Sequence, residues 1–380
     1  MQTLISRQAY LDWLRILAIA GVLFFHSAMP YVAEWGWHLK NKELSNLLME
    51  FNFWLSRFRM PLLLFISGAV TCVMLQKRTG SGFIGLRFRR LFIPLIAGVL
   101  IVVPPQVYLE RVHNGYTGNF FDFYPTIFTS GAYPAGNFSW HHLWFIVYLF
   151  IYDVVFTPFF TWIIRSRAKH WFDQLFSWFA TGRRIYLLML PGVLIHTFLA
   201  GKFPGTNDLI HDYCFFFYWL FFLLVGFLCM CAPALMDCLE RDRRLSLAIA
   251  FASIICINYF RWNNLEDAIQ TRFYWALYPV MAYMWVFALV GYGKRYLNKP
   301  HKSLGYLNQM VYPFYIVHQT VIVILTFYVI RTTDTIWMKY FFTVLLTLAI
   351  SLTLIHVFIR PFKAGRWLFG MKDQTTNKPA

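Results

Sequence analysis

The most regular feature of the chain is a series of long apolar runs separated by short polar connections. Each run holds roughly 18–23 residues, the length that an α-helix needs to cross the hydrocarbon core of a bilayer. We therefore expect an all-α fold, a polytopic transmembrane helix bundle of about ten spans. The predicted spans are 8–30, 52–75, 88–109, 141–163, 184–201, 212–232, 245–261, 272–292, 308–330 and 339–360.

The connections between the runs differ in charge, and this difference predicts their orientation. Lys and Arg residues near the ends of spans mark the cytoplasmic side of a membrane. The connections before the first run and at 76–90, 164–184, 233–244, 293–307 and from 360 onward together hold 23 of them, against 10 in the alternate connections. Both termini are therefore expected in the cytoplasm. The connection 111–140 is expected outside, where it could form a lid over an outer-facing site.

Composition supports a membrane protein and narrows its class. Hydrophobic residues make up 59% of the chain and charged residues only 13%, whereas about a quarter of a soluble domain is charged. The net charge of +17 fits cytoplasmic loops beside anionic headgroups, and no stretch resembles a nucleic-acid module. The six cysteines form no CxxC pair, so we expect neither disulfides nor zinc. We predict one membrane domain over 1–362 and a polar cytoplasmic tail over 363–380.

The first run, LDWLRILAIAGVLFFHSAMP, contains one arginine and one histidine. Arg15 and His26 are eleven positions apart, so on a helix they lie within roughly 20° of one face and about 16 Å apart along the axis. A charge inside a span costs roughly 2.5–3.5 kcal/mol and by default indicates a functional site. The alternative is that Arg15 extends its charge to the near interface and His26 is a hydrogen-bonded residue of the bundle.

Two further runs contain residues that are unusual within a membrane-spanning helix. In FRMPLLLFISG, Pro61 and Gly68 interrupt the second span and indicate either a shaped cavity or a kinked helix. In GFIGLRFRRLFIP, Arg87 and Arg90 are three positions apart, so on a helix they share a face and could bind phosphate groups. A cluster that only marks the cytoplasmic side would contain the same residues.

Histidines also occur in the fourth and ninth runs. The fourth run begins WHHLWF, with His142 among aromatic residues at the expected outer interface. In the ninth, Tyr312, Tyr315 and His318 form one polar stripe on a helix that ends near the middle of the membrane. Each of these histidines could equally be a hydrogen-bonded core residue.

Buried imidazoles and a cationic inner mouth together indicate group transfer. An imidazole with a pKa of about 6.5 can take a proton from a hydroxyl group, or accept an acyl group itself, at neutral pH. A cationic mouth suits a donor with phosphates, such as an acyl-coenzyme A, and no metal is expected. P-loop, HExxH, GxSxG and DxD motifs are absent. A transporter or flippase that uses the same polar face is the main alternative, and a scaffolding membrane protein is another.

Taken together, these motifs resemble membrane-bound acyltransferase family 3. LDWLRILAIAGVLFFH matches its signature of an arginine followed by a histidine in the first span. RMPLLLFISG, FIGLRFRRLFIP, HHLWF and YPFYIVH are similar to later motifs in the same order, so the resemblance covers about 12–318. SRFRM and WHLKNKELSNLLMEFNFWL are similar to its glucan biosynthesis protein C-like branch.

The resemblance implies O-acyl transfer, of the acetyl or succinyl class, from cytoplasmic acyl-CoA to a carbohydrate or other hydroxyl acceptor at the outer face of a bacterial inner membrane. By position it implies that His26 is the catalytic histidine and Arg15 its partner in the motif, and that Arg87 and Arg90 bind the donor. We add His142, Tyr315 and His318 as candidate substrate-binding residues.

Overall fold

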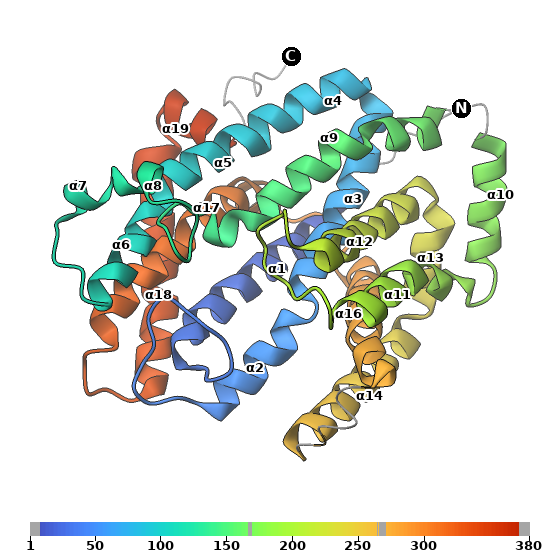
Figure 1. Cartoon of the computed structure of the whole chain (residues 1–380). Helices are drawn as coiled ribbons and strands as arrows, with labels where there is room; N and C mark the ends of the chain where they lie inside the picture. The colour runs from blue at the N-terminus through green and yellow to red at the C-terminus, as the bar shows by residue number, and fades with distance from the viewer. Residues whose placement is uncertain (1–7, 166–168, 264, 266–270, 372–380) are drawn as a thin grey trace. The chain divides into compact units, whose positions relative to one another are not determined.

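The computed structural model is built from helices and describes residues 8–165, 169–263, 265 and 271–371 (Figure 1). Among these residues, nine helical segments are long and apolar enough to cross a membrane, and a shorter apolar segment covers Arg184–Leu199. The prediction of an all-α polytopic bundle is confirmed. The described chain divides into two compact units, and five helices contribute residues to both: α1 (Ala9–Ala28), α2 (Asn46–Ser56), α4 (Gly80–Arg87), α9 (Trp144–Arg165) and α17 (Lys302–Val329).

The first unit comprises residues up to Ala18, Ser56–Gly85 and Ile151–Leu304. Its remaining helices are α3 (Arg59–Lys77), α10 (Lys169–Ala180), η5 (Arg184–Met189), α11 (Leu190–Leu199), α12 (Tyr213–Cys231), α13 (Pro233–Arg241), α14 (Arg243–Trp262) and α16 (Arg272–Tyr296). The pairs α3 with α12 and α14 with α16 pack most extensively in this unit.

The second unit comprises Ile19–Leu55, Leu86–Phe150 and the residues from Gly305 onward. Its remaining helices are η1 (Met29–Tyr31), η2 (Phe88–Phe92), α5 (Ile93–Ala97), η3 (Gly98–Val102), α6 (Pro104–His113), α7 (Phe120–Phe123), α8 (Thr126–Thr129), η4 (His141–Leu143), α18 (Ile336–Leu354), η6 (Ile355–Ile359) and α19 (Lys363–Leu368). The segments from α4 to α6 follow one another as a single span, Gly80–His113. The last nine residues of the predicted tail lie outside the described part of the chain.

One predicted span differs from the structure. The run 184–201 begins with a 3₁₀ turn, η5, and continues as the ten-residue helix α11. Pro191 stands in the first turn of α11, and a proline is tolerated there because the amide it lacks has no intrahelical partner. Together η5 and α11 form one apolar helical segment, Arg184–Leu199, which is shorter than the nine segments long enough to cross a membrane. The helical segment predicted over 184–201 is present, but it is shorter than predicted.

Pro61 and Gly68 of the second run have different roles in the structure from those that the sequence predicts. The chain breaks between α2 and α3, ahead of Pro61, which lies in the first turn of α3. Gly68 lies where α3 crosses α12. A Cβ atom added to Gly68 would lie 1.9 Å from the carbonyl oxygen of Leu223, and one added to Gly226 would lie 1.9 Å from that of Phe65. The two glycines let the helix backbones meet, as small residues do between membrane helices.

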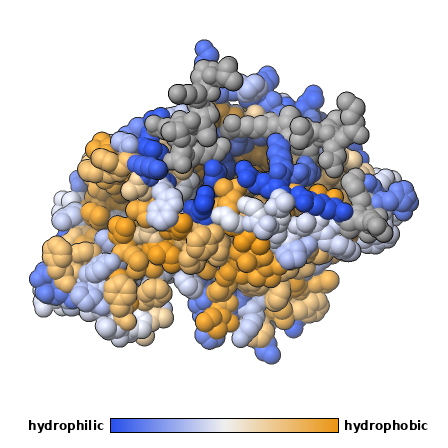
Figure 2. Space-filling model, turned by 90° about the horizontal axis from the view of Figure 1, so that it is seen from above, coloured by the Kyte–Doolittle hydropathy of each residue, from blue (hydrophilic) through white to orange (hydrophobic). Residues whose placement is uncertain are grey.

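Large apolar side chains are exposed on the outer faces of several spans, and Figure 2 shows broad hydrophobic areas on the molecular surface. On α18, Phe341 and Leu345 are 52% and 65% exposed. On α14, Phe251 and Ile255 are 48% and 67% exposed. Broad apolar surfaces are rare on soluble monomers and are expected where the surface contacts lipid instead of water. The chain is an integral membrane protein.

Candidate functional site

The candidate site lies in the second unit and is centred on a pair of histidines. His26, in the last turn of α1, places Nδ1 3.0 Å from Nε2 of His318 on α17, and the rings stack with centroids 5.2 Å apart. His318 Nδ1 lies 2.7 Å from the carbonyl oxygen of Tyr315. His318 is fully buried and His26 is 9% exposed. The sequence predicted both histidines separately, and the structure brings them into direct contact.

The hydrogen bonds assign the protons of this pair. A carbonyl oxygen only accepts, so His318 Nδ1 donates to Tyr315, and Nε2 of a neutral His318 carries the lone pair. That lone pair accepts the proton on Nδ1 of His26. In this tautomer Nε2 of His26 is the basic nitrogen, held in place by a relay through His318 to the backbone. The arrangement follows the logic of a catalytic base oriented by a second group.

His142 completes this group of rings. It lies in η4, its Nε2 donates to the carbonyl oxygen of Ile316 at 2.9 Å, and its ring centroid is 5.3 Å from that of His318. The Tyr315 hydroxyl donates to the carbonyl oxygen of His142. The four predicted residues His26, His142, Tyr315 and His318 therefore form one buried cluster, in which Tyr315 and His142 fix η4 against α17.

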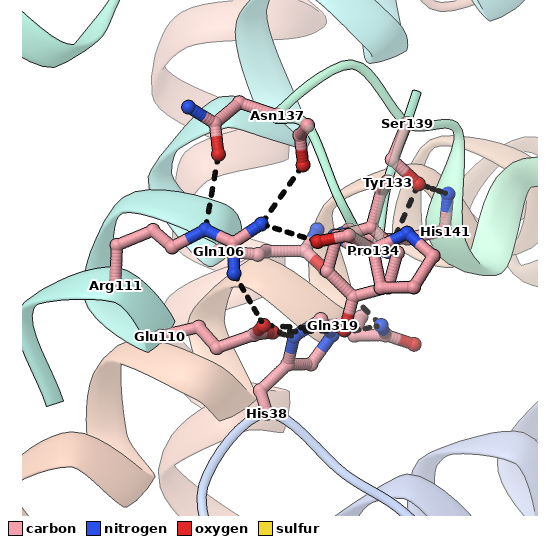
Figure 3. Close-up of polar contacts among 11 residues, drawn as sticks. His38, Gln106, Glu110, Arg111, Tyr133, Pro134, Asn137, Ser139, His141 and Gln319 are labelled. Atoms are coloured by element: carbon pink, nitrogen blue, oxygen red, sulfur yellow. Dashed lines mark hydrogen bonds and ion pairs between the residues drawn. The ribbon is translucent and has the colours of Figure 1, made fainter. Parts of the chain in front are cut away.

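A second polar network adjoins the histidine cluster (Figure 3). His38 Nδ1 forms a short hydrogen bond with the buried carboxylate of Glu110 on α6. His38 Nε2 lies 3.4 Å from the amide nitrogen of Gln319, which donates to Gln106 Oε1 at 3.1 Å. The Tyr133 hydroxyl donates to Glu110 at 3.2 Å. Burial, with a further contribution from the Glu110 carboxylate, raises the pKa of Tyr133 to about 12, so this phenol remains a donor at neutral pH.

Lysine side chains hold the loop that presents His38. Lys40 Nζ donates to the carbonyl oxygens of Met29, at 2.9 Å, and of Val32. Lys339 Nζ donates to Asn41 Oδ1 at 3.2 Å. Burial lowers the pKa of Lys40 to about 8. These contacts attach the loop that carries His38 to η1 and to the first turn of α18, and so fix the position of His38.

Arg111 fastens the connection 111–140 over the second network. Its Nη2 donates to the carbonyl oxygens of Pro134 and Gly136, each at 2.8 Å, and its Nε donates to Asn137 Oδ1 at 3.0 Å (Figure 3). This clasp, formed by Arg111 with Pro134, Gly136 and Asn137, sets Tyr133 above Glu110. The sequence predicts that the connection 111–140 could cover a site, and the structure places Tyr133 of this connection in contact with Glu110 of the second network.

The predicted arginines lie elsewhere in the chain. Arg15 belongs to the part of α1 in the first unit and forms an ion pair with Asp12 at 3.1 Å. Arg87 is buried at the end of α4, and Arg90 follows in the π-helical turn η2. Twenty residues of one span separate Arg90 from Glu110, or about 30 Å along a helix. Arg90 and Glu110 therefore occupy opposite ends of the span Gly80–His113.

The sequence reasoning missed His38, Glu110 and Gln319. One signal was available, because Gln106 and Glu110 are four positions apart at the end of the third apolar run and therefore share a helix face. Gln319 also directly follows His318. The partner of Glu110, His38, lies 72 positions away in a short connection. Among the residues that the structure describes, no group of three or more His, Cys, Asp or Glu side chains is placed to hold a metal ion.

Comparison with known proteins adds a family match and distant relatives. The acyltransferase family 3 model, described as "Acyltransferase domain", matches residues 8–356. Proteins named glucans biosynthesis protein C from Salmonella paratyphi A, Salmonella agona and Salmonella paratyphi B are each 27% identical to this chain over 210 residues. The match covers 50% of this chain and 52% of each relative, so the chain spans about half the length of the curated relatives it matches. No solved structure matches it.

Proposed function

Because this chain belongs to acyltransferase family 3, we propose that it is an integral-membrane O-acyltransferase that moves an acyl group, of the acetyl or succinyl class, from acyl-CoA to a hydroxyl of a carbohydrate. The observation that carries the proposal is the His26–His318 pair, in which a buried relay leaves His26 Nε2 as the base. The printed name of the relatives supports a glucan as the acceptor class.

His26 would handle the proton of the reaction. As the acceptor oxygen attacks the thioester carbon, its O–H bond breaks and the proton moves to His26 Nε2. The C–S bond then breaks, and the same proton passes from His26 to the departing thiolate. The protons balance within one cycle, and His318 keeps Nδ1 of His26 protonated throughout. A correctly placed base of this kind contributes about 10²–10⁴-fold to a rate.

The donor would enter from the opposite end of the bundle. Arg87 and Arg90 supply charge-assisted hydrogen bonds for phosphate oxygens, and a π-helical turn of the kind that follows Arg87 is frequent at functional sites. Arg15 is about 16 Å from His26 along α1, so it would contact the donor and not the base. Since Lys and Arg concentrate on the connections at that end, we assign the donor to the cytoplasm, the acceptor to the outer face and the protein to the bacterial inner membrane.

The test uses purified full-length protein, radiolabelled acetyl-CoA or succinyl-CoA, and a glucose oligosaccharide as acceptor. We expect His26→Ala to lower transfer by about 10²–10⁴-fold. The matched control is His113→Asn, because His113 is exposed at the end of α6. Unchanged transfer by His26→Ala would refute the mechanism. Movement of unmodified oligosaccharide across liposomes without acyl-CoA would instead identify a transporter.

A further inference from the structure

The hydrogen bonds around His38 leave some polar atoms of the network without a close partner. Glu110 fixes the tautomer of His38: a carboxylate accepts, so His38 Nδ1 carries the proton. Its Nε2 is then an acceptor, and it meets only a long contact of 3.4 Å from the Gln319 amide nitrogen. This contact is near the limit for a hydrogen bond. A shorter donor, such as a hydroxyl group, would pair with Nε2 better.

Two neighbouring side chains have buried polar atoms without a hydrogen-bond partner among the described residues: Gln319 Oε1 and His141 Nε2. Gln319 is 2% exposed. The His141 ring meets the rings of His38 and Tyr133 edge to face, with centroids 4.5 and 4.8 Å apart. A buried polar atom that stays unpaired destabilises the fold, so such atoms are rare in native structures and need an explanation.

The backbone at His141 is also strained. Its φ angle is +38°, in the left-handed region that residues with a Cβ rarely adopt. Ser139 holds the residue there, because its Oγ accepts from the His141 backbone amide at 3.0 Å and lies 3.1 Å from Nδ1 of the ring. Strain of this kind persists where the surroundings over-determine a conformation, and it is concentrated at ligand sites. Here it directs the His141 ring toward His38.

An aromatic ring joins this network to the base. The Trp37 indole packs against both imidazoles, with its centroid 5.4 Å from that of His26 and 5.0 Å from that of His38. Its Nε1 is a third buried polar atom without a partner in the described chain. Along α17, Gln319 is the residue after His318. A molecule bound by Gln319 and His38 would therefore lie beside the histidine pair.

The unpaired atoms define the chemistry of the ligand. Gln319 Oε1 accepts, Trp37 Nε1 donates, and His38 Nε2 accepts, so a complementary group must both donate and accept. The carboxylate of Glu110 is already paired, because it meets His38, Tyr133 and, at 3.9 Å, Arg111. The site therefore fits a neutral ligand with several hydroxyl groups and does not call for a phosphate or carboxylate.

We infer that His38, Gln319, His141 and Trp37, with Glu110 orienting His38, form the subsite that binds the acceptor sugar as a neutral polyol. This inference rests on the proposed function for its place in the reaction, but the binding itself is independent of acyl transfer. The clasp on Arg111 holds Tyr133 against Glu110 at the edge of this subsite.

The experiment measures binding of a neutral glucose tetrasaccharide to purified full-length protein by calorimetry, together with steady-state transfer. Gln319→Met and Glu110→Gln are expected to weaken tetrasaccharide binding at least tenfold. They should raise the KM for the tetrasaccharide equally and leave the KM for acyl-CoA unchanged. His26→Ala should bind the sugar as wild type does. Glu43→Gln, an exposed carboxylate of the same loop, is the matched control.

The outcomes separate the two proposals. If the wild type binds the tetrasaccharide but transfers no acyl group, and Gln319→Met abolishes binding, the subsite stands and the proposed function fails. If transfer is normal and both variants keep wild-type affinity and KM for the sugar, the subsite is refuted. Tighter binding of a tetrasaccharide carrying a carboxylate would also refute it. Thermal unfolding and acyl-CoA binding of each variant confirm that it is folded.

Discussion

The crossing of α3 and α12 allows a sharp prediction about packing. Gly68→Ala adds a Cβ atom 1.9 Å from the Leu223 carbonyl oxygen, and it would also lie 2.9 Å from the Phe227 amide nitrogen. Real Cβ atoms stay at least 3.0 Å from such atoms, so the helices must separate by about 1 Å. Overpacking of this size costs about 1–3 kcal/mol, because both neighbours are backbone atoms that no rotamer change can move away.

The same substitution at an open position should have the opposite sign. Gly85 lies in α4, and a Cβ atom there meets nothing within 4 Å. Alanine in a helix gains about 0.5–1 kcal/mol over glycine through the entropy of the unfolded chain. We therefore expect Gly68→Ala to lower the thermal unfolding midpoint of the purified protein by several degrees and Gly85→Ala to hold or raise it.

Gly226→Ala provides the reciprocal measurement, because its Cβ atom would meet the Phe65 carbonyl oxygen at the same 1.9 Å. Since one separation of the helices relieves both clashes, the double variant should lose less stability than the sum of the two single variants. The reasoning is refuted if Gly68→Ala unfolds at the wild-type midpoint, or if the two single losses simply add.

Three further predictions concern the site. Arg90→Gln should raise the KM for acyl-CoA about 10–100-fold, because a charged hydrogen bond contributes about 1.5–3 kcal/mol. Arg89→Gln, at an exposed position, should leave this KM unchanged. Equal effects of the two substitutions would argue against specific donor binding. His318→Asn should lower the transfer rate about 5–100-fold, because the orientation of the base is lost. Steady-state kinetics should show little change in the KM for either substrate. An unchanged rate would exclude the relay. Burial lowers the pKa of Lys40 to about 8 from 10.5, so the unfolded chain binds more protons between these values and stability should rise with pH across that window. Unfolding midpoints of Lys40→Met should lack this rise, while those of the exposed Lys42→Met keep it.

Much of the architecture was predictable because bilayer thickness fixes the length of a spanning helix. Nine of the predicted runs coincide with long apolar helices of the described chain. The exception, 184–201, shows the limit of the method, since hydropathy does not report the 3₁₀ turn that shortens α11. Similarly, the sequence shows Gly68 but not its partner Gly226, because the contact depends on how two distant helices cross.

The site was predictable to the extent that polar residues are conspicuous in apolar runs. His26, His142 and His318 were identified in this way, and the structure shows that they share one cluster. His38 could not be identified, because a polar residue in a polar connection is unremarkable. Its significance depends on Glu110, which reaches it only after α6 and the loop have folded together.

Arg111 holds the connection 111–140 by the later part of that connection. All three of its acceptors lie within four residues, Pro134 to Asn137, whereas α7 and α8 come earlier in the same connection. Thr126 in α8 also supports this arrangement, because its Oγ1 accepts from Asn137 Nδ2 at 2.8 Å. A foreign sequence grafted onto 117–122 would leave Thr126 and the clasp in place, so this stretch is where the connection can be exchanged without moving Tyr133.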